Sequence, residues 1–504
     1  MKIFSAAQIK KWDEFTIQNE PISSINLMER AATYCYCWLI ENNFAGKFFK
    51  IFCGKGNNGG DGLAIARLLI QNNCRVTVYI LEFGNIGTDD FQTNLERLHQ
   101  FTTDIHFIQS ADFFPAIKKN EIIIDAIFGS GLNKSLEGIS ASFVNHLNIS
   151  GATIVSIDLP TGLYADKSSR GNTVIKANYT LSFQNYKLAF LLPENEMFCG
   201  DVHLLNIGLH HEFEQIEAAD FELIDKELIK TIYKLRTKFA HKGTYGHAAL
   251  LCGSTGMMGA AVLSSLACLR SGVGKLTSYI PKCGYNILQT TVPEAMCNIA
   301  GEDHILSAPE IEKHDVVGIG PGIGLYSSHK KLLTEIFEKI NTPMVIDADA
   351  LNIIAQNKEL LKTIPPSSIL TPHPKEFERL FGKTENDFEK LELCKQKSAA
   401  HNIYIVLKGH NSFICTPDGK QFFNSTGNAG MATGGSGDVL TGIITGLLAQ
   451  GYSSLHASLL GVYLHGLAGD HAAAKYAEEA MIAGDITGCL GDAFKEISSR
   501  FVKK

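Results

Sequence analysis

Residues 51–69, IFCGKGNNGGDGLAIARLL, decide the fold of the first half of the chain. An apolar run ends at Gly54, the stretch 54–59 matches the pattern G-x-G-x-x-G, and a helix-like apolar pattern follows. A strand, a glycine turn and a helix in this order are typical of a dinucleotide-binding fold. The first hypothesis is therefore an NAD-dependent dehydrogenase, in which Glu82, about twenty residues further on, would bind the ribose.

The alternation of strand-like runs and helical segments extends from Phe48 to about residue 184. This alternation predicts a parallel sheet covered on both faces. Before Phe48, Ala6, Ile9, Trp12 and Phe15 recur at three-residue spacing and predict an additional helix.

The pattern changes between about Gly208 and Phe239, which is charged and helix-prone and has no strand-like run longer than a few residues. A second alternating series begins near His247 and ends in a glycine-rich turn and an apolar helix. At about 150 residues per domain, 504 residues allow two to four domains. We predict an α/β chain with two doubly wound, three-layer domains, at 1–215 and 225–504.

Composition narrows the ligand class. The formal net charge is -7, so there is no electrostatic footprint for nucleic acid or an acidic membrane, and we expect small-molecule ligands. The twelve cysteines lack the spacing of zinc sites and are expected to be reduced thiols. The N-terminus has no signal-peptide pattern, and no window approaches the roughly 18 apolar residues of a membrane span. The expectation is a cytoplasmic enzyme.

Three features argue against the dehydrogenase. Asn57, Asn58 and Asp61 crowd the glycine loop, where a carboxylate would repel a pyrophosphate. Asp125 and Asp158 each follow a strand, and the carboxyl ends of parallel strands line one crevice. Oxygen ligands without Cys or His suit a hard cation such as K⁺ or Mg²⁺. The alternative is that Asp125 and Asp158 are helix caps or turn residues.

The motifs GKGNNGGDGLAIAR, DAIFGSGL and SIDLPTGL resemble the N-terminal epimerase domain of the NAD(P)H-hydrate repair enzymes, over about residues 1–215. The resemblance implies a Rossmann-like domain that interconverts the R and S hydrates of NADH and NADPH, with Asp158 in acid/base catalysis. It implies K⁺ ligands at Asn58, Asp125 and Thr161. For acid/base catalysis Lys187 is a weaker candidate than Asp158, because its side chain is expected to be solvated. The implied substrate-binding residues are Asn57, Asn58, Gly59, Gly60, Asp61, Gly129, Ser130, Gly131, Leu132, Asn133, Lys134, Ser135 and Asp158.

A second site is predicted in NSTGNAGMATGGSGDVLTGIITGLLAQG, residues 424–451. The small residues 434–437 precede Asp438, which stands at the start of a predicted apolar helix. The free backbone amides and the dipole at the start of a helix favour binding of a phosphoryl group. Asp438 could then accept the proton of an attacking hydroxyl; the alternative is a simple N-cap. His373 and Glu376 on a proline-fixed turn, and the glycines at 318–324, offer further contacts. No Walker A motif is present.

The glycine turn with its Asp resembles the ribokinase-like superfamily. KGTYGHAALLCGS, GIGPGIG, LTPHPKEFERL, KGHNS and GNAGMATGGSGDVLTG narrow the resemblance to the NAD(P)H-hydrate dehydratases over about residues 225–504. Ser436 and Ser412 stand where the family often has Thr, and both keep the hydroxyl.

This second resemblance implies that Asp438 helps to phosphorylate the hydrate hydroxyl, which then leaves as phosphate. The two-domain layout favours ADP over ATP by analogy, and Mg²⁺ and a homo-oligomer are expected. The implied nucleotide-binding residues are Lys408, Gly409, His410, Asn411, Ser412 and Gly437; the implied S-hydrate residues are Ala260, Gly322, His373 and Asp438.

Two other functions stay open on the residues alone. One is a ribokinase-like kinase of a small alcohol with an accessory nucleotide-binding domain, against which the His373 loop argues. The other treats the N-terminal half as a non-catalytic nucleotide-binding or partner-docking module, against which Asp125 and Asp158 argue.

Overall fold

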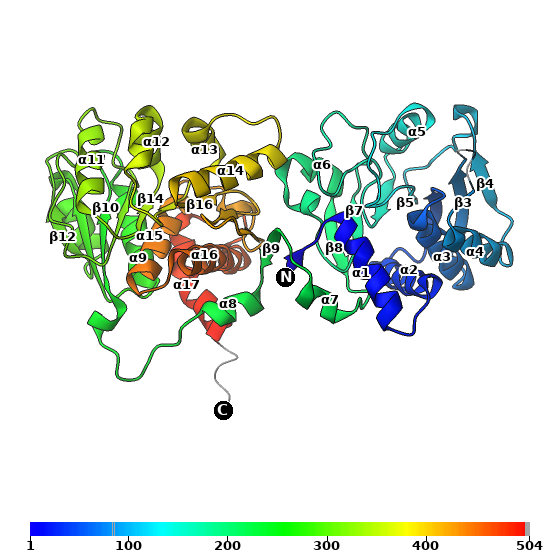
Figure 1. The fold of residues 1–504 in the computed structure, drawn as a ribbon, viewed down its shortest axis with the longest axis horizontal. Coiled ribbons are helices and arrows are strands. Elements are labelled where there is room, and N and C mark those ends of the chain that lie inside the picture. Colours follow the sequence, from blue (N-terminus) through cyan, green and yellow to red (C-terminus); the bar gives the residue numbers. More distant parts are fainter. Residues whose placement is uncertain (83, 85, 499–504) are drawn as a thin grey trace. The chain divides into compact units, whose positions relative to one another are not determined.

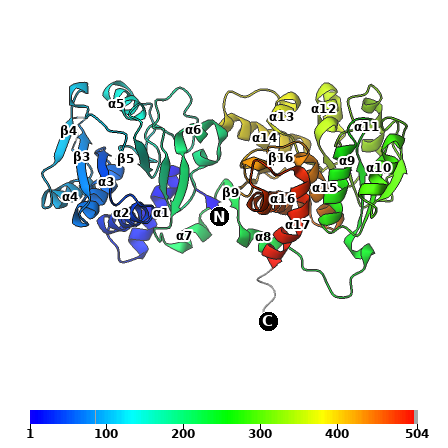
Figure 2. The same cartoon turned by 180° about the vertical axis from the view of Figure 1, so that it is seen from behind.

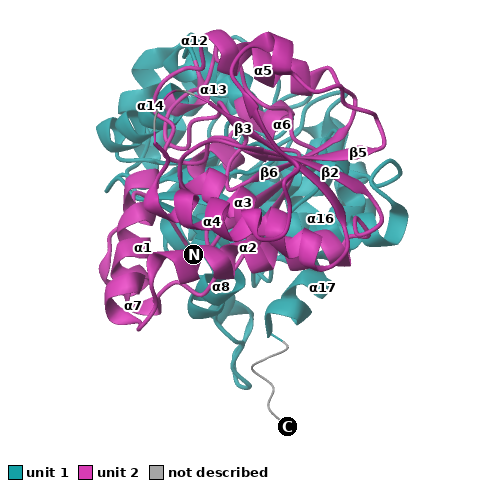
Figure 3. Cartoon of the chain, turned by 90° about the vertical axis from the view of Figure 1, so that its right-hand side faces the viewer, with its two compact units in different colours: residues 1, 221–385, 389–504 teal, residues 2–220, 386–388 magenta. Residues whose placement is uncertain are grey.

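The computed structural model describes residues 1–82, 84 and 86–498. The chain divides into two compact units, coloured separately in Figure 3. The N-terminal unit comprises residues 2–220 and 386–388, and the C-terminal unit comprises residue 1, residues 221–385 and the chain from 389. Residues 386–388 join the N-terminal unit through reciprocal hydrogen bonds: the Asp387 amide donates to the Glu194 carboxylate (2.7 Å), and the Glu194 amide donates to the Asp387 carboxylate (2.8 Å).

The N-terminal unit alternates strands and helices after two initial helices, as the sequence predicts. Its strands are β1 (Lys2–Ile3), β2 (Phe48–Cys53), β3 (Arg75–Leu81), β4 (Ile105–Ile108), β5 (Glu121–Ala126), β6 (Thr153–Ile157), β7 (Tyr179–Phe183) and β8 (Asp201–Leu205). Its helices are α1 (Ala6–Asn19), α2 (Ser24–Glu41), α3 (Asn57–Gln71), α4 (Asp89–His99), α5 (Gly138–Asn148), α6 (Glu196–Cys199) and α7 (His211–Ile216).

The sheet of this unit has the order β4-β3-β2-β5-β6-β7-β8, and its neighbouring strands are parallel. The apolar side chains of β2 after Phe48 are buried, as expected for a central parallel strand with helices on both faces. Helices α2, α3 and α4 pack on one face and α5 on the other (Figure 1). The strand order reverses between β2 and β5, which places a ligand crevice at their carboxyl ends.

The C-terminal unit repeats the alternation with more elements. Its strands are β9 (Phe221–Ile224), β10 (His247–Leu251), β11 (Lys275–Ile280), β12 (Met296–Ile299), β13 (Val316–Ile319), β14 (Met344–Ile346), β15 (Ile369–Leu370), β16 (Tyr404–Leu407), β17 (Phe413–Cys415) and β18 (Gln421–Asn424). Its helices are α8 (Lys226–Ile232), α9 (Met258–Arg270), α10 (Tyr285–Thr291), α11 (His329–Lys339), α12 (Ala348–Gln356), α13 (Pro374–Phe381), α14 (Asp387–His401), α15 (Ser436–Ala449), α16 (Ser454–Tyr476) and α17 (Ala483–Ser498).

From β9 onward, the strand order of this unit is β9-β18-β17-β16-β15-β14-β13-β10-β11-β12. The sheet is parallel except at β16-β17-β18, which pair antiparallel. The short strand β9 lies in the charged segment and pairs in parallel with β18. Helices α9, α15, α16 and α17 pack together on one face, and α11, α12 and α13 lie on the other (Figures 1 and 2). Helix α15 is buried around nearly its whole circumference, which explains its uniformly apolar sequence.

All twelve cysteines are free thiols, most of them buried. Within the described part of the chain, every helix is too short or too polar to span a bilayer.

Candidate active sites

The glycine turn before α3 is tightly packed against neighbouring backbone. A Cβ atom added to Gly54 would lie 2.0 Å from the Ile127 carbonyl oxygen, and one added to Gly59 would lie 1.8 Å from the Gly54 carbonyl oxygen. Glycine is therefore required at both positions by close backbone approach. The turn brings the start of α3 against the carboxyl end of β5.

Asn58, Gly129 and Asp158 converge beside this turn. A Cβ atom added to Gly129 would lie 3.1 Å from Oδ2 of Asp158 and 3.2 Å from Cγ of Asn58. The side-chain nitrogen and oxygen of Asn58 are both buried without a hydrogen-bond partner in the protein. Because buried polar atoms are almost always paired, the Asn58 amide marks a position for a ligand or ion.

Asp158 is held by several contacts at the end of β6. Its backbone is left-handed (φ 64°), an uncommon conformation that Asp tolerates better than most residues. Oδ1 lies 2.7 Å from the Lys187 ammonium, and Oδ2 accepts the Ser130 amide at 3.1 Å. Burial alone would raise the pKa of Asp158, but the charge and hydrogen bond of Lys187 and the hydrogen bonds of Ser130 lower it below its ordinary value.

Lys187 corrects one expectation. The prediction of a solvated side chain is wrong, because Lys187 is fully buried. Its ammonium donates to the Ser182 hydroxyl (2.7 Å) and the Phe183 carbonyl (3.0 Å), besides pairing with Asp158. A buried ammonium needs such partners, and here they fix it against the carboxylate.

Asp125 and Thr161 form a second oxygen-rich group. Asp125 lies within β5 and is fully buried, so it does not cap a helix. It accepts the Thr161 hydroxyl (2.6 Å), the Thr161 amide (2.9 Å) and the Ser156 hydroxyl (2.8 Å). Burial raises the pKa of Asp125, and the hydrogen bonds of Thr161 and Ser156 oppose the shift only in part. A cation beside Asp125 would favour its ionised form.

Two more acids surround Asp158. Burial, then the charge of Asp158, raise the pKa of Asp13 to about 7, while Lys187 opposes the shift. Burial, then the charges of Asp158 and Asp13, hold the pKa of Asp61 well above its ordinary value. Sequence reasoning missed Asp13, which lies in α1, more than forty residues before the glycine turn.

Glu82 is engaged by the glycine turn itself. Its carboxylate forms an ion pair with Lys55 and accepts the Gly84 amide at 2.8 Å. The hydrogen bond of Lys55, then that of Gly84, lower the pKa of Glu82.

In the C-terminal unit, the glycine turn leads directly into α15. Gly435 is the N-cap residue and has a left-handed backbone (φ 93°), which favours glycine. Asp438 is the third residue of the helix, so the alternative of a simple N-cap is wrong. Ser436 places its hydroxyl 3.3 Å from Nε2 of His465.

Lys408 lies at the centre of an ionic network next to this turn. Its ammonium donates to Oδ1 of the buried Asp347 at 2.8 Å, and the Thr441 hydroxyl donates to Oδ2 of Asp347 at 2.6 Å. A Cβ atom added to Gly437 would lie 3.2 Å from the Lys408 nitrogen. The network therefore ties the end of β16, the end of β14 and the first turns of α15 to one another.

Asp438 lies close to further carboxylates. Burial, then the charge of Asp347, raise the pKa of Asp438 to about 7; Lys408 opposes the shift, while Asp349 and Glu376 add to it. Such a carboxyl group is a suitable general base near neutral pH.

Asp347 and Asp349 are site residues that sequence reasoning missed. Between them, Ala348 has a left-handed backbone (φ 49°), a strained conformation for Ala. Oδ2 of Asp349 accepts the Gly324 amide at 2.8 Å, which connects the loop after β13 to α12. The usable signal was the position of Asp347 directly after β14, the same signal that identified Asp158.

His373 caps α13 and contacts Glu376. Its Nδ1 accepts the Lys375 amide (3.1 Å) and the Glu376 amide (3.4 Å), while Nε2 lies 3.5 Å from Oε1 of Glu376. Oε2 of Glu376 lies 4.0 Å from the Lys408 ammonium, so this corner borders the ionic network.

The remaining predicted residues of this unit lie at the start of α9, in the loop after β13 and in the turn between β16 and β17. A Cβ atom added to Gly322, whose φ is 63°, would lie 2.9 Å from Cβ of Ala260, so these two residues are neighbours. Gly409 and His410 are exposed in the turn between β16 and β17, and the Ser412 hydroxyl donates to the Gly409 carbonyl at 3.3 Å. Lys408 connects this turn to Asp438 and its neighbours.

Comparison with known proteins gives the same two-part division. A family described as YjeF-related protein N-terminus matches residues 24–189, and one described as NAD(P)H-hydrate dehydratase matches residues 248–490. The bifunctional NAD(P)H-hydrate repair enzyme Nnr of Moorella thermoacetica is 34% identical, with 97% of this chain and 96% of that protein covered. The enzyme of the same name from Escherichia coli is 32% identical, over 87% of this chain and 84% of that protein.

A solved structure resembles the C-terminal unit. The ADP/ATP-dependent NAD(P)H-hydrate dehydratase of Bacillus subtilis, co-crystallised with ATP/Mg²⁺, has a TM-score of 0.50 and 32% identity and covers 56% of this chain and all of that protein. These matches contradict the NAD-dependent dehydrogenase hypothesis. The chain is an enzyme and belongs to the family of bifunctional NAD(P)H-hydrate repair enzymes.

Proposed function

We propose that the chain repairs hydrated NADH and NADPH at two separate sites. Residues 1–215 would epimerise the R and S hydrates, and residues 225–504 would return the S hydrate to NAD(P)H using ADP. The observation that carries the proposal is the pair of lysine-containing carboxylate groups, one around Asp158 and one around Asp438.

At the epimerase site, the ionised Asp158 acts as the proton acceptor. Epimerisation at a carbon that bears a hydroxyl group and a ring nitrogen proceeds when the hydroxyl proton moves to Asp158 and the carbon–nitrogen bond opens, which forms an aldehyde and leaves the electron pair of the bond on the nitrogen. Attack of the nitrogen on the other face of the aldehyde, with return of the proton to the oxygen, gives the other epimer. Lys187 keeps Asp158 ionised, and the turn at 129–135 with Asn57–Asp61 would bind the dinucleotide.

Potassium fits the oxygen atoms beside this site. Asn58 has an unpaired buried carbonyl oxygen, and Asp125 is a buried carboxylate whose ionised form a cation would favour. Asn58, Asp125 and Thr161 would hold the ion, which supplies positive charge near the anionic dinucleotide.

At the dehydratase site, Asp438 accepts the proton of the hydrate hydroxyl as its oxygen attacks the terminal phosphate of ADP. Phosphate is a better leaving group than hydroxide, and the ring nitrogen expels it. Loss of a proton from the neighbouring carbon then restores the dihydronicotinamide. The products are NAD(P)H, AMP and phosphate. Gly437 and Lys408–Ser412 would bind the nucleotide, and Ala260, Gly322 and His373 would bind the hydrate.

Magnesium fits the same site when its nucleotide is bound. Among the described residues, no three His, Cys, Asp or Glu side chains converge closely enough to coordinate a metal by themselves. Mg²⁺ typically uses one or two carboxylates together with substrate phosphates, and Asp347, Asp349 and Glu376 are the carboxylates whose charges act on Asp438. The ion would neutralise charge on the transferred phosphoryl group.

The decisive experiment supplies a mixture of R and S NADH hydrates with ADP and measures the recovered reduced-nicotinamide absorbance. Complete recovery is expected. Recovery of the S fraction alone would contradict epimerisation, and no recovery with ADP or ATP would contradict dehydration. Parallel reactions with ATP in place of ADP determine the nucleotide preference.

A further inference from the structure

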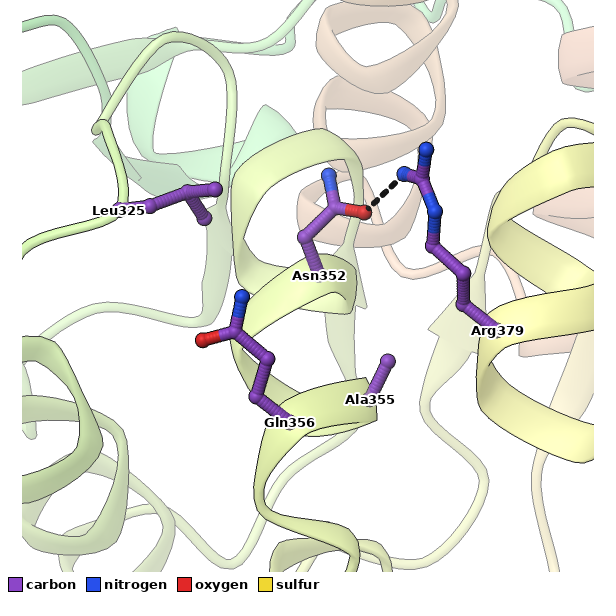
Figure 4. A pocket seen from close by; sticks show the side chains of 5 residues that line it. All are labelled: Leu325, Asn352, Ala355, Gln356 and Arg379. Carbon is purple, nitrogen blue, oxygen red and sulfur yellow. Dashed lines mark hydrogen bonds between the residues drawn. The ribbon is translucent and has the colours of Figure 1, made fainter.

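A cavity of about 430 Å³ opens in the C-terminal unit between the loop after β13 and helices α12 and α13 (Figure 4). Small-molecule sites are typically on the order of 300 to 1,000 Å³. None of the residues proposed above for hydrate or nucleotide lines the cavity. Its lining residues are Leu325, Asn352, Ala355, Gln356 and Arg379.

The cavity lies on the hydrate side of the site. Leu325 follows Gly322 in the loop after β13, Asn352 lies one helical turn beyond Asp349, and Arg379 lies one turn beyond Glu376. The proposed nucleotide residues, in contrast, follow β16 and begin α15. The hydrogen bond from Gly324 to Asp349 fixes the loop against α12 and so holds one wall of the cavity in place.

Arg379 supplies the positive charge of this cavity. Its Nη1 donates to Oδ1 of Asn352 at 2.7 Å, which orients the guanidinium group (Figure 4). A guanidinium has five N–H donors, so most of them stay available for a bound anion. The amides of Asn352 and Gln356 lie beside the same space, and Leu325 and Ala355 offer apolar contacts.

The dehydratase site around Asp438 contains more negative than positive side chains, so binding of an anionic dinucleotide requires a further positive group such as Arg379. The group around Asp438 contains four carboxylates, and its ammonium, Lys408, already bonds to Asp347. A dinucleotide carries a pyrophosphate, and NADPH carries one further phosphate on its ribose. Arg379 is close enough to act on this site: burial, then the charges of Lys408 and Arg379, lower the pKa of His373.

We propose that this cavity binds a phosphate-bearing part of the hydrated dinucleotide, with Arg379 as the phosphate ligand. The inference rests on the proposed dehydratase function. The reacting ring lies at Asp438 while the remainder of the dinucleotide extends over the loop at 320–325 to Arg379. Arginine is well suited to this role because its planar fork matches the oxygen atoms of a phosphate.

The test compares Arg379→Ala with two other variants in the full chain. Arg379→Ala should raise the KM for the S hydrate about tenfold or more, the usual effect of losing a charged hydrogen bond, and leave kcat and the KM for ADP unchanged. Ala355→Leu should also raise the hydrate KM, because it fills the cavity without changing charge. Lys383→Ala removes the same charge from an exposed side chain just beyond α13 and should leave both constants unchanged.

The two hydrates distinguish the two phosphate sources. An equal effect on NADH hydrate and NADPH hydrate assigns Arg379 to the pyrophosphate, and an effect on NADPH hydrate alone assigns it to the ribose phosphate; either result supports the proposal. A higher KM for ADP, or unchanged constants for both hydrates, overturns it.

Calorimetric titration of S NADPH hydrate without ADP separates this inference from the proposed function. Hydrate binding that weakens in Arg379→Ala supports the cavity even if the wild-type protein shows no turnover. Equal binding by wild type and variant, or no binding by wild type, overturns the cavity proposal whatever the turnover.

Discussion

Each unit places a lysine ammonium among carboxylates, fully buried at Lys187 and partly buried at Lys408, but only Lys187 pairs with the proposed base. In the N-terminal unit, Lys187 pairs with Asp158, the proposed base, and lowers its pKa. In the C-terminal unit, Lys408 pairs with Asp347 instead, and burial leaves Asp438 with a pKa of about 7. Burial acts to raise the pKa of both proposed bases, and a directly paired ammonium outweighs it only at Asp158.

The largest expected effect is the loss of dehydration when Asp438, the proposed base that pairs with no lysine, is replaced. Asp438→Asn keeps the shape of the side chain but cannot accept a proton, so dehydration should fall about 10³-fold. Absorbance recovery from pure S hydrate with ADP measures this loss. Epimerisation, followed as exchange between R and S hydrates, should be unchanged in the same protein. Dehydration that persists near the wild-type rate would remove Asp438 from the mechanism.

Asp158→Asn should have the converse effect. Epimerisation should fall about 10²-fold or more, because the proton acceptor is lost and Lys187 is left with a neutral amide. Dehydration of pure S hydrate serves as the internal control for folding of the chain. Intact epimerisation in this variant would refute the role proposed for Asp158.

The difference between the sites also shows what sequence could predict. The two α/β units followed from the alternation of strand-like runs and helical segments. The acids at Asp125 and Asp158 followed from the rule that the carboxyl ends of parallel strands meet in a crevice. The same rule covers Asp347, which directly follows β14, and Asp349 lies two residues further on in the first turn of α12. No glycine-rich turn follows this strand to mark the site in the sequence.

Other features depend on distant packing and have no local signal. Asp13 lies in α1, near the start of the chain. Its carboxylate comes near Asp158 only because α1 packs onto the rest of the N-terminal unit. Lys187 stands between polar residues at 184–185 and an apolar run at 188–192, so its own side chain gave no sign of burial, which follows from the fold of the segment after β7. The antiparallel strands β17 and β18 could not be distinguished from parallel ones by apolar pattern alone.

The pH dependence of the two reactions should distinguish Asp438 from Asp158, with a smaller change in rate than either substitution causes. A base acts in its ionised form, so kcat/KM for dehydration should rise with pH through about 7, where free Asp438 ionises. Epimerisation should show no such rise, because the lowered pKa of Asp158 keeps it ionised throughout that range. Matching rises in both profiles would contradict the distinction.

Lys187→Met sharpens this comparison. Loss of the ammonium leaves burial as the main influence on Asp158, so its pKa should increase and the acidic limb of the epimerase profile should move to higher pH. The dehydratase profile of the same variant should be unchanged and reports that the chain is folded. An unshifted epimerase profile would show that Lys187 does not set the ionisation of Asp158.

The smallest expected effect is that of the monovalent cation. Exchanging K⁺ for Li⁺ should weaken hydrate binding in the epimerase reaction a few-fold, since Asn58 and Asp125 would lose an ion of fitting size. Dehydration in the same solutions corrects for general salt effects, because its proposed site uses other residues. Asp125→Asn should abolish the difference between the two salts. If epimerisation responds equally to both salts in the wild-type protein, the unpaired amide of Asn58 contacts the dinucleotide rather than a cation.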